Sequence, residues 1–195
     1  MAANVDETTI NIADPAQNTI MTAQLKAEAI ANNLSITTGN RVIVIAADTI
    51  VALDEHMLGK PAGGDEAQSM LQALRDRDHK VYTGLALIDL RTGVEVTAFH
   101  AAEIHMRPYT DQEIERYVAS GDPLDKAGAY AIQHPQFRPA ASLDGCYLGV
   151  MGLSVCQLLD QLNRLEVPFL ADMNILHKAH NGYPCPLLAK LGPLA

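Results

Sequence analysis

Apolar residues recur along the chain with the spacing of helices that bury one face. In the segment DEAQSMLQAL, residues 65–74, they follow the i, i+3, i+4, i+7 spacing. Leucines repeat this spacing over residues 154–165, and a Thr-x-x-Glu capping box opens the segment from Thr110 to Gly121. The segment after Pro15 is rich in Ala, Gln, Glu, Lys and Leu, which favour helix. The sequence therefore predicts four helices.

Runs of β-branched and apolar residues predict strands between these helices. The segment RVIVIAAD predicts a strand that is buried on both faces and ends at Asp48, with extended chain continuing to Leu53. Residues 81–90 and 94–106 flank an Arg-Thr-Gly turn, which is typical of an antiparallel hairpin. The segment CYLGV, residues 146–150, predicts a short strand. Helices and strands together indicate the α/β class.

The pattern fades after residue 167, where Pro and Gly recur without a sustained period. We expect one domain over residues 1–167 and a C-terminal appendage over residues 168–195, because 195 residues fit one globular domain. The start of the sequence lacks the features of a secretory leader, and no apolar run reaches the roughly 20 residues of a membrane span. We therefore expect a cytoplasmic protein with no membrane partner.

Charge and cysteine usage narrow the function further. The chain has 14 Lys and Arg against 23 Asp and Glu, a formal charge of −9, so we expect no nucleic-acid partner and only a local phosphate site. Cys146, Cys156 and Cys185 are odd in number and lack Cys-x-x-Cys spacing, which argues against both a disulfide framework and a structural zinc site. We expect reduced, buried thiols. The three-residue spacing of His177 and His180 we interpret as coincidence.

The candidate chemistry lies in carboxylates and lysines in loop-like settings. The signatures GxxxxGK[ST], GxGxxG, HExxH and GxSxG are absent from the sequence. Glu7, Asp48, Lys60 and Lys126 remain, and carboxylates hold divalent cations and activate water while lysines neutralise phosphate. This combination indicates polyphosphate hydrolysis. Taken singly, such a carboxylate is more often a cap or turn residue, and a loop lysine is more often merely solvated.

Seven segments in chain order closely resemble one family. They are VDET, LKAEAIA, AADTIVALDEHMLGKP, EAQSMLQAL, HKVYTGLAL, TDQEIERYVASGDPLDKAGAYAIQ and GCYLGVMGLSV. Together they resemble the Maf family, the septum-formation-inhibitor-like nucleoside triphosphate pyrophosphatases, from Val5 to Leu165. The resemblance implies an elongated α/β fold with a mixed central sheet flanked by helices, related to inosine triphosphate pyrophosphatase-like folds. It also implies a nucleoside triphosphate substrate, a divalent cation, Mg²⁺ or Mn²⁺, and a homodimer as one state to expect.

The resemblance assigns roles to individual residues. Asp48 matches the family's proton acceptor, which activates water for attack on the α-phosphorus, and Asp48 and Glu7 match its metal ligands. Thr49 and Gln133 match positions linked to base selection, and the form DKAGAYAIQ resembles the branch that acts on dTTP and UTP. The polar shell around metal and phosphates is matched by Glu7, Lys26, Lys60 and Lys126.

The sequence departs from the family at its start. Family members carry a strand and a Ser-x-Ser-Pro-Arg-Arg loop before the segment matched by VDET, and this sequence opens at Met1 directly before that segment. Because such a loop supplies bidentate phosphate contacts, we expect weak activity, lower stability or self-association without it. Two functions follow: a pyrophosphatase acting on dTTP, UTP or modified pyrimidine nucleotides, or a truncated, catalytically impaired relative that binds nucleotides or partners.

Overall fold

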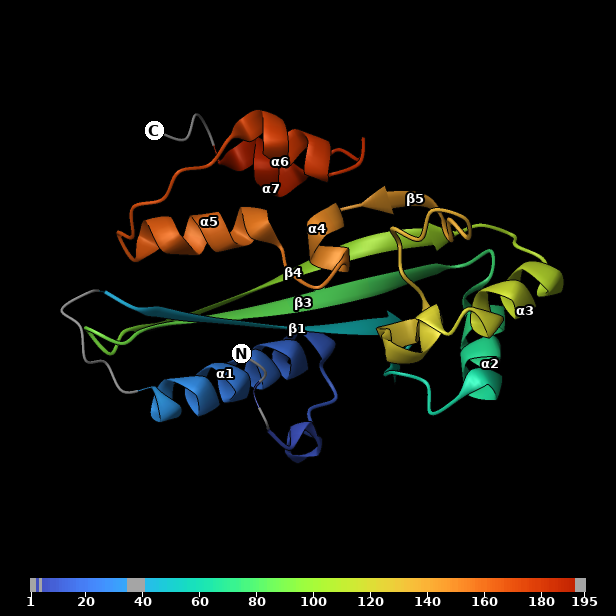
Figure 1. The fold of residues 1–195 in the computed structure, drawn as a ribbon, viewed down its shortest axis with the longest axis horizontal. Helices are drawn as coiled ribbons and strands as arrows, with labels where there is room; N and C mark the ends of the chain where they lie inside the picture. The colour runs from blue at the N-terminus through green and yellow to red at the C-terminus, as the bar shows by residue number, and fades with distance from the viewer. Residues whose placement is uncertain (1–2, 4, 35–40, 192–195) are drawn as a thin grey trace.

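The computed structural model describes residue 3 and residues 5–34 and 41–191 (Figure 1). The α-helices are α1 (Pro15–Asn33), α2 (Gly64–Leu74), α3 (Asp111–Ala119), α4 (Tyr147–Val150), α5 (Val155–Arg164), α6 (Met173–Ala179) and α7 (Pro186–Lys190). The strands are β1 (Ile43–Leu53), β2 (His56–Leu58), β3 (Asp78–Asp89), β4 (Glu95–Met106) and β5 (Ala140–Asp144). Short 3₁₀ helices span Glu7–Thr9, Asp122–Asp125 and Ala127–Ala129. The four helices predicted up to residue 165 are confirmed.

The strands form one sheet in the order β2-β1-β3-β4-β5. The α/β class with helices flanking the sheet is confirmed, but the described strands all pair antiparallel, so the mixed pairing implied by the resemblance is not seen among them. The predicted hairpin is β3 with β4. Strand β2 pairs with β1 only from Val51 to Leu53. Among the described residues, the outer edge of β1 from Ile43 to Ile50 therefore has no strand partner.

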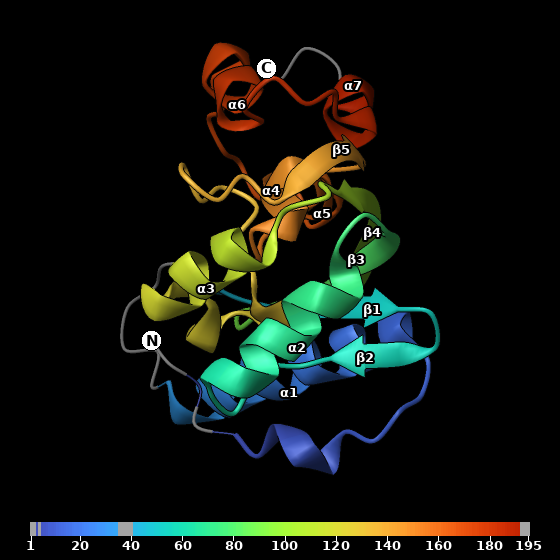
Figure 2. The ribbon, with the colours of Figure 1, turned by 90° about the vertical axis from the view of Figure 1, so that its right-hand side faces the viewer.

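Helices cover both faces of the sheet. Helix α1 lies below the long strands in Figure 1, whereas α4 and α5 lie above them, with α6 and α7 farther out on the same side. Figure 2 shows these layers end-on, with α2 and α3 at one end of the sheet. The largest hydrophobic core fills that end, where Leu71 of α2, Ile104 of β4 and Ile114 of α3 are fully buried. Burial of this apolar area stabilises the end that carries the loops of the candidate site.

Helix α1 approaches the sheet closely because the side chains on both sides of the contact are small. Thr19, Ala23 and Ala27 recur every fourth residue and are fully buried against the sheet. Opposite them on β3, a Cβ added to Gly84 would lie 2.3 Å from the backbone carbonyl of Thr19. Gly84 pairs with Asp48 in the register of β1 and β3. The close approach thus fixes α1 directly over the stretch of β1 that bears the candidate catalytic carboxylate.

Two local predictions are wrong. The segment CYLGV forms the short helix α4 rather than a strand, since a short apolar run does not distinguish a buried strand from a buried helix. Strand β1 is not buried on both faces, because Ile45 is 43% exposed, and it runs through Asp48 to Leu53 instead of ending there. Asp48 therefore lies in the middle of a strand.

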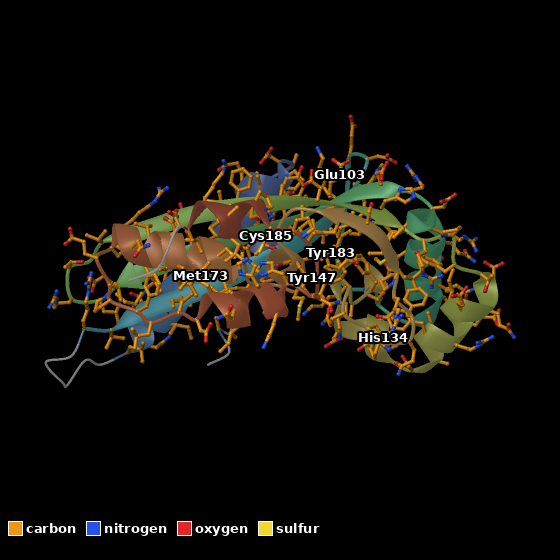
Figure 3. All side chains as sticks on the ribbon, turned by 90° about the horizontal axis from the view of Figure 1, so that it is seen from above. Glu103, His134, Tyr147, Met173, Tyr183 and Cys185 are labelled. Atoms are coloured by element: carbon orange, nitrogen blue, oxygen red, sulfur yellow. The ribbon has the colours of Figure 1, made fainter. Side chains whose placement is uncertain are left out.

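Residues 168–191 form two short helices instead of the patternless chain that the sequence suggests. Leu176 of α6 and Leu188 of α7 are buried in a small core with Leu159 of α5. The rings of Tyr147 and Tyr183 stack at 5.4 Å with an interplanar angle of 12°, and Figure 3 shows these two side chains together. No helix in the described part of the chain is both long enough and apolar enough to cross a membrane.

Candidate functional site

A cavity of about 290 Å³ lies beside the unpaired stretch of β1. Its lining brings together segments that are far apart in the sequence: the middle of β1, the loop after β2, the 3₁₀ helices before Tyr130, and the end of α4. The lining residues are Ala47, Asp48, Thr49, Val51, Lys60, Val81, Asp125, Lys126, Ala127, Tyr130, Val150, Met151 and Gly152. Four of the residues predicted from the sequence, Asp48, Thr49, Lys60 and Lys126, therefore share one cavity.

Asp48 forms an ion pair with Lys26 of α1. The Lys26 Nζ lies 2.7 Å from Asp48 Oδ1 and 3.0 Å from Glu7 Oε1, so one ammonium group bridges two carboxylates. The side chains of Lys26 and Asp48 are only 20% and 12% exposed. Burial by itself lowers the pKa of Lys26, but hydrogen bonds and charges from Asp48 and Glu7 outweigh it, and the pKa is raised. Lys26 is therefore a permanent cation that holds the Asp48 carboxylate in place.

Local capping positions the elements that carry Lys26 and Glu7. Helix α1 begins with Pro15 at its first turn, and the Asp14 carboxylate accepts a hydrogen bond from the Gln17 backbone N–H at 2.7 Å. The Asp6 carboxylate accepts one from the Thr8 N–H at 3.1 Å, which caps the 3₁₀ helix that bears Glu7. The VDET segment thus works as a cap that turns Glu7 toward Lys26.

Thr49 is joined to the opposite side of the cavity through a residue that sequence reasoning missed. The hydroxyls of Thr49 and Thr83 lie 3.0 Å apart, and the Thr83 hydroxyl donates to the Gly149 carbonyl of α4 at 2.7 Å. Thr83 is 1% exposed. Thr83 lies in the segment HKVYTG, which is part of the family resemblance, and this membership could have marked it as a candidate. Thr83 therefore fixes α4, and with it the Val150–Gly152 side of the cavity.

The two loops that carry Lys60 and Lys126 are bonded to each other. The Gly128 N–H donates to the Gly59 carbonyl at 3.0 Å, and Gly128 has φ +67°, the left-handed region that glycine adopts readily. A Cβ at Gly128 would also lie 3.0 Å from both methyl groups of Val51. The motifs GKP and DKAG therefore form one structural unit that presents two ammonium groups to the same cavity.

Acidic groups from the same loop restrain Lys126. Its Nζ donates to Asp125 Oδ1 and, at 3.2 Å, to the Asp122 carbonyl oxygen. The hydrogen bond that Lys126 donates to Asp125 outweighs partial burial and raises the pKa of Lys126. Asp125 lines the cavity, and its position directly before Lys126 could have marked it as a site residue. The cavity is therefore lined by two lysines, of which Lys126 is held by the neighbouring Asp125 carboxylate.

Comparison with known proteins identifies the family of this chain. The family model described as "Maf-like protein" matches residues 1–165. The chain belongs to the Maf-like protein family. Proteins named "dTTP/UTP pyrophosphatase" are 41% identical over 151 residues in Dehalococcoides mccartyi (strain CBDB1) and 40% identical over 164 residues in Pelotomaculum thermopropionicum. The matches cover 77% and 84% of this chain. They span 65% and 83% of the respective relatives.

A third relative, the "dTTP/UTP pyrophosphatase" of Desulforamulus reducens, is 43% identical over 145 residues, which are 74% of this chain and 73% of that protein.

The structure of the Maf-like chain does not bring every predicted residue to the Asp48 cavity. Gln133 is exposed and lines a different cavity, with His134, Arg138 and Tyr183 around it. The backbone turns away after Ile132, which separates Gln133 from the DKAG part of its own motif. A role for Gln133 in base selection stays a prediction.

The wall of the Maf-like cavity also contains Tyr130, another residue that sequence reasoning missed. Its hydroxyl lies 2.7 Å from Nε2 of the buried His79 on β3. Burial lowers the pKa of His79 to about 4, so this histidine is neutral at pH 7 and adds no charge to the site. Burial also raises the pKa of Tyr130 far above its usual range. Tyr130 therefore serves as an uncharged side of the cavity.

The oxygen donors around Lys26 fit the divalent cation that the Maf resemblance implies. Glu7 and Asp48 present carboxylates to one position, and Mg²⁺ is commonly bound by one or two carboxylates together with phosphate oxygens. The Lys26 ammonium lies within 3.0 Å of both carboxylates, so the two groups are close enough together to share one cation. Glu7 is 54% exposed, which leaves it free to turn toward a second cation.

Proposed function

We propose that this protein hydrolyses dTTP or UTP to the nucleoside monophosphate and pyrophosphate. The observation that carries the proposal is the convergence of Asp48 with Lys60 and Lys126 on one cavity. The names of the relatives at about 40% identity supply the substrate class. A triphosphate carries several negative charges, and two lysines that line the cavity match that charge in an otherwise acidic protein.

In this proposal Asp48 acts as the general base. Its ion pair with Lys26 uses Oδ1, so Oδ2 is the oxygen that accepts a proton from the attacking water. Lys60 and Lys126 hold the phosphate oxygens, whose charge grows in the transition state, and stabilise that state most. When bound, a divalent cation supplies further positive charge at these oxygens, and Glu7 and Asp48 are the residues that would hold it.

The experiment that tests the proposal is a product analysis over a panel of nucleotides. The purified chain is incubated with dTTP, UTP, CTP, dATP and GTP in the presence of Mg²⁺ or Mn²⁺. We expect dTTP and UTP to yield monophosphate and pyrophosphate in equal amounts. Release of the nucleoside diphosphate together with inorganic phosphate would contradict cleavage at the α-phosphorus. Binding of dTTP without any turnover would favour the second candidate, a nucleotide-binding relative, which the unpaired edge of β1 beside the cavity supports.

The lysines give a prediction about binding. Replacing Lys60 or Lys126 by Ala should lower kcat/KM for dTTP about 10- to 100-fold, since each loses a charged hydrogen bond to phosphate that is strongest in the transition state. Melting temperatures should change little, because both side chains lie in loops and make no core contact. Lys80→Ala, an exposed lysine on β3 outside this cavity, is the matched control. Equal losses of activity and melting temperature in the loop variants would show a structural role instead.

Other expectations remain predictions under this proposal. They are the selection of the base by Thr49 and Gln133, the choice between Mg²⁺ and Mn²⁺, the homodimer, and action on the cytoplasmic nucleotide pool. Thr49 is the better placed of the two specificity residues, because it lines the cavity that holds Asp48.

A further inference from the structure

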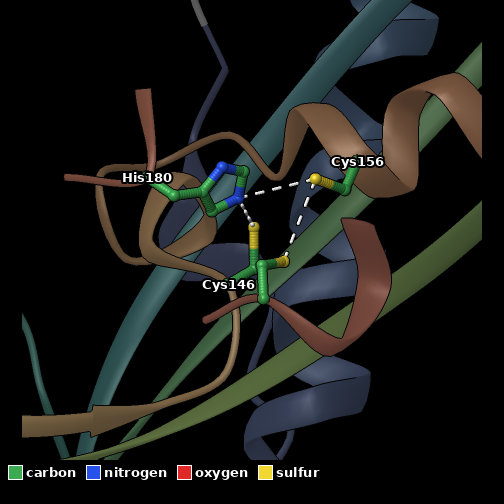
Figure 4. Close-up of side chains that lie close together, drawn as sticks. Cys146, Cys156 and His180 are labelled. Carbon is green, nitrogen blue, oxygen red and sulfur yellow. Dashed lines mark hydrogen bonds between the residues drawn. The ribbon is translucent and has the colours of Figure 1, made fainter. Parts of the chain in front are cut away.

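Outside the nucleotide cavity, three cysteines and one histidine converge on a single point. Cys146, Cys156, Cys185 and His180, here called the cysteine–histidine cluster, present ligand atoms that all lie within 4.8 Å of one another (Figure 4). All four residues are buried. They come from the residue before α4, the first turn of α5, the residue after α6 and the residue before α7. The tertiary fold thus assembles the cluster from four separate elements.

Three of the six separations between the ligand atoms match the edges of a tetrahedral zinc site, and all six are within 4.8 Å. Nε2 of His180 lies 3.6 Å from the Cys146 Sγ and 3.5 Å from the Cys156 Sγ, and the sulfurs of Cys156 and Cys185 are 3.9 Å apart. With zinc–sulfur bonds of about 2.3 Å and zinc–nitrogen bonds of about 2.05 Å, a tetrahedron has S···N edges of about 3.6 Å and S···S edges of about 3.8 Å. Each measured separation agrees with the corresponding edge within about 0.1 Å.

The histidine is held in the tautomer that a metal ligand requires. Its Nδ1 lies 2.6 Å from the Leu176 carbonyl oxygen, which accepts only from an N–H, so Nδ1 carries the proton and Nε2 carries the lone pair. One lone pair accepts one hydrogen bond, yet two sulfurs lie equally close to it. One atom bound at the centre accounts for both short contacts with a single interaction at Nε2.

The thiolates also have the surroundings of metal ligands. The Ser154 hydroxyl donates to the Cys146 Sγ at 3.4 Å, and the Leu188 backbone N–H donates to the Cys185 Sγ at 3.4 Å. Such donors stabilise the negative charge of a coordinated sulfur. Three sulfurs and one imidazole nitrogen form a donor set that favours zinc over the oxygen-seeking Mg²⁺ and Ca²⁺.

We propose that the cysteine–histidine cluster binds one structural zinc ion that fastens residues 168–191 to the rest of the protein. Four buried protein ligands close the coordination sphere, so the site has the form of a structural centre rather than a catalytic one. Helices α6 and α7 have only 7 and 5 residues, too short to be stable alone, and each buries one leucine. Zinc adds its binding free energy to the small hydrophobic core of this segment, which is little for a segment of this length.

The zinc site also connects to the nucleotide cavity. Cys146 precedes α4, and its backbone N–H donates to Nε2 of His100 on β4 at 2.8 Å. Three residues along, the Gly149 carbonyl accepts from Thr83, and the following residues line the cavity. A metal bound at Cys146 would hold this side of the cavity as well as the C-terminal helices.

The test is the metal content of the full chain purified under reducing conditions, measured by mass spectrometry over all transition metals. We expect one zinc per chain. Cys185→Ser should lose the zinc, while its new hydroxyl can cap α7 in place of the thiol, and His177→Ala, at an exposed histidine of α6, should keep the zinc. Iron or copper in place of zinc would overturn the assignment, as would a disulfide between Cys156 and Cys185, detected as the loss of two hydrogens from the intact mass.

A second measurement uses the unaltered chain, in case the variant does not fold. Metal-free protein titrated with Co²⁺ should develop the visible ligand-field bands of tetrahedral thiolate coordination, saturating at one equivalent, and zinc should abolish them. Removal of the metal should make proteolytic cleavage within residues 168–191 about tenfold faster or more, because the segment loses the attachment that the metal provides. Absence of these bands, or cleavage that zinc does not slow, would overturn the proposal. Neither result depends on nucleotide turnover.

Discussion

Replacing Asp48 by Asn is expected to lower kcat for dTTP about 10²- to 10⁴-fold, the usual effect of removing a general base. Asn keeps the size of the side chain and can still contact Lys26, but its amide does not accept a proton from water. The ion pair at 2.7 Å is also lost, so the melting temperature has to be measured alongside activity. Pyrophosphate release under saturating dTTP and Mg²⁺ reports kcat directly.

Asp54→Asn is the matched control for this experiment. Asp54 follows β1 in the same segment of sequence, lies outside the Asp48 cavity, and pairs with Arg77 on the surface at 2.9 Å. Its φ of 54° is one that Asn tolerates, so the control should keep both fold and turnover. If Asp48→Asn instead turns over dTTP at the rate of the parent, Asp48 is not the base.

Gly84→Ala is expected to lower the free energy of unfolding by about 3 kcal/mol or more, at the upper end of overpacking effects. The new methyl group would meet the Thr19 carbonyl carbon and oxygen at 2.3 Å and the Ile20 nitrogen at 2.6 Å. These are backbone atoms of a helix, so relief requires α1 as a whole to move away from the sheet. Since α1 carries Lys26, the same movement would disturb its contact with Asp48.

Urea denaturation measures the loss, and Gly59→Ala is the control. A Cβ at Gly59 would meet no atom within 4 Å, so its effect should stay within about 0.5 kcal/mol. At about 2–4 °C per kcal/mol for a chain of this size, Gly84→Ala should also melt about 6–12 °C lower than the parent. An unchanged urea midpoint for Gly84→Ala would mean that α1 does not pack on Gly84 as described.

Several features follow from the sequence alone because short-range interactions decide them. Helix α3 begins at its predicted capping box, with Thr110 and Glu113 each bonded to the other's backbone, and Gly121 ends the segment at φ 78°. Helix α2 buries Ala67, Leu71 and Leu74 on the predicted face. Family motifs likewise identified Asp48, Lys60 and Lys126, which the fold then brought to one cavity.

The tertiary structure alone decided the features that depend on contacts between distant residues. The ligands Cys146 and His180 are 34 positions apart, and Cys156 and Cys185 are 29 apart, so no Cys-x-x-Cys spacing marked them. The short apolar segment CYLGV forms a helix, and Gln133 lines a different cavity from the DKAG part of its motif. Local periodicity reports the nearest turns of the chain, whereas packing of separate elements determines which side chains meet.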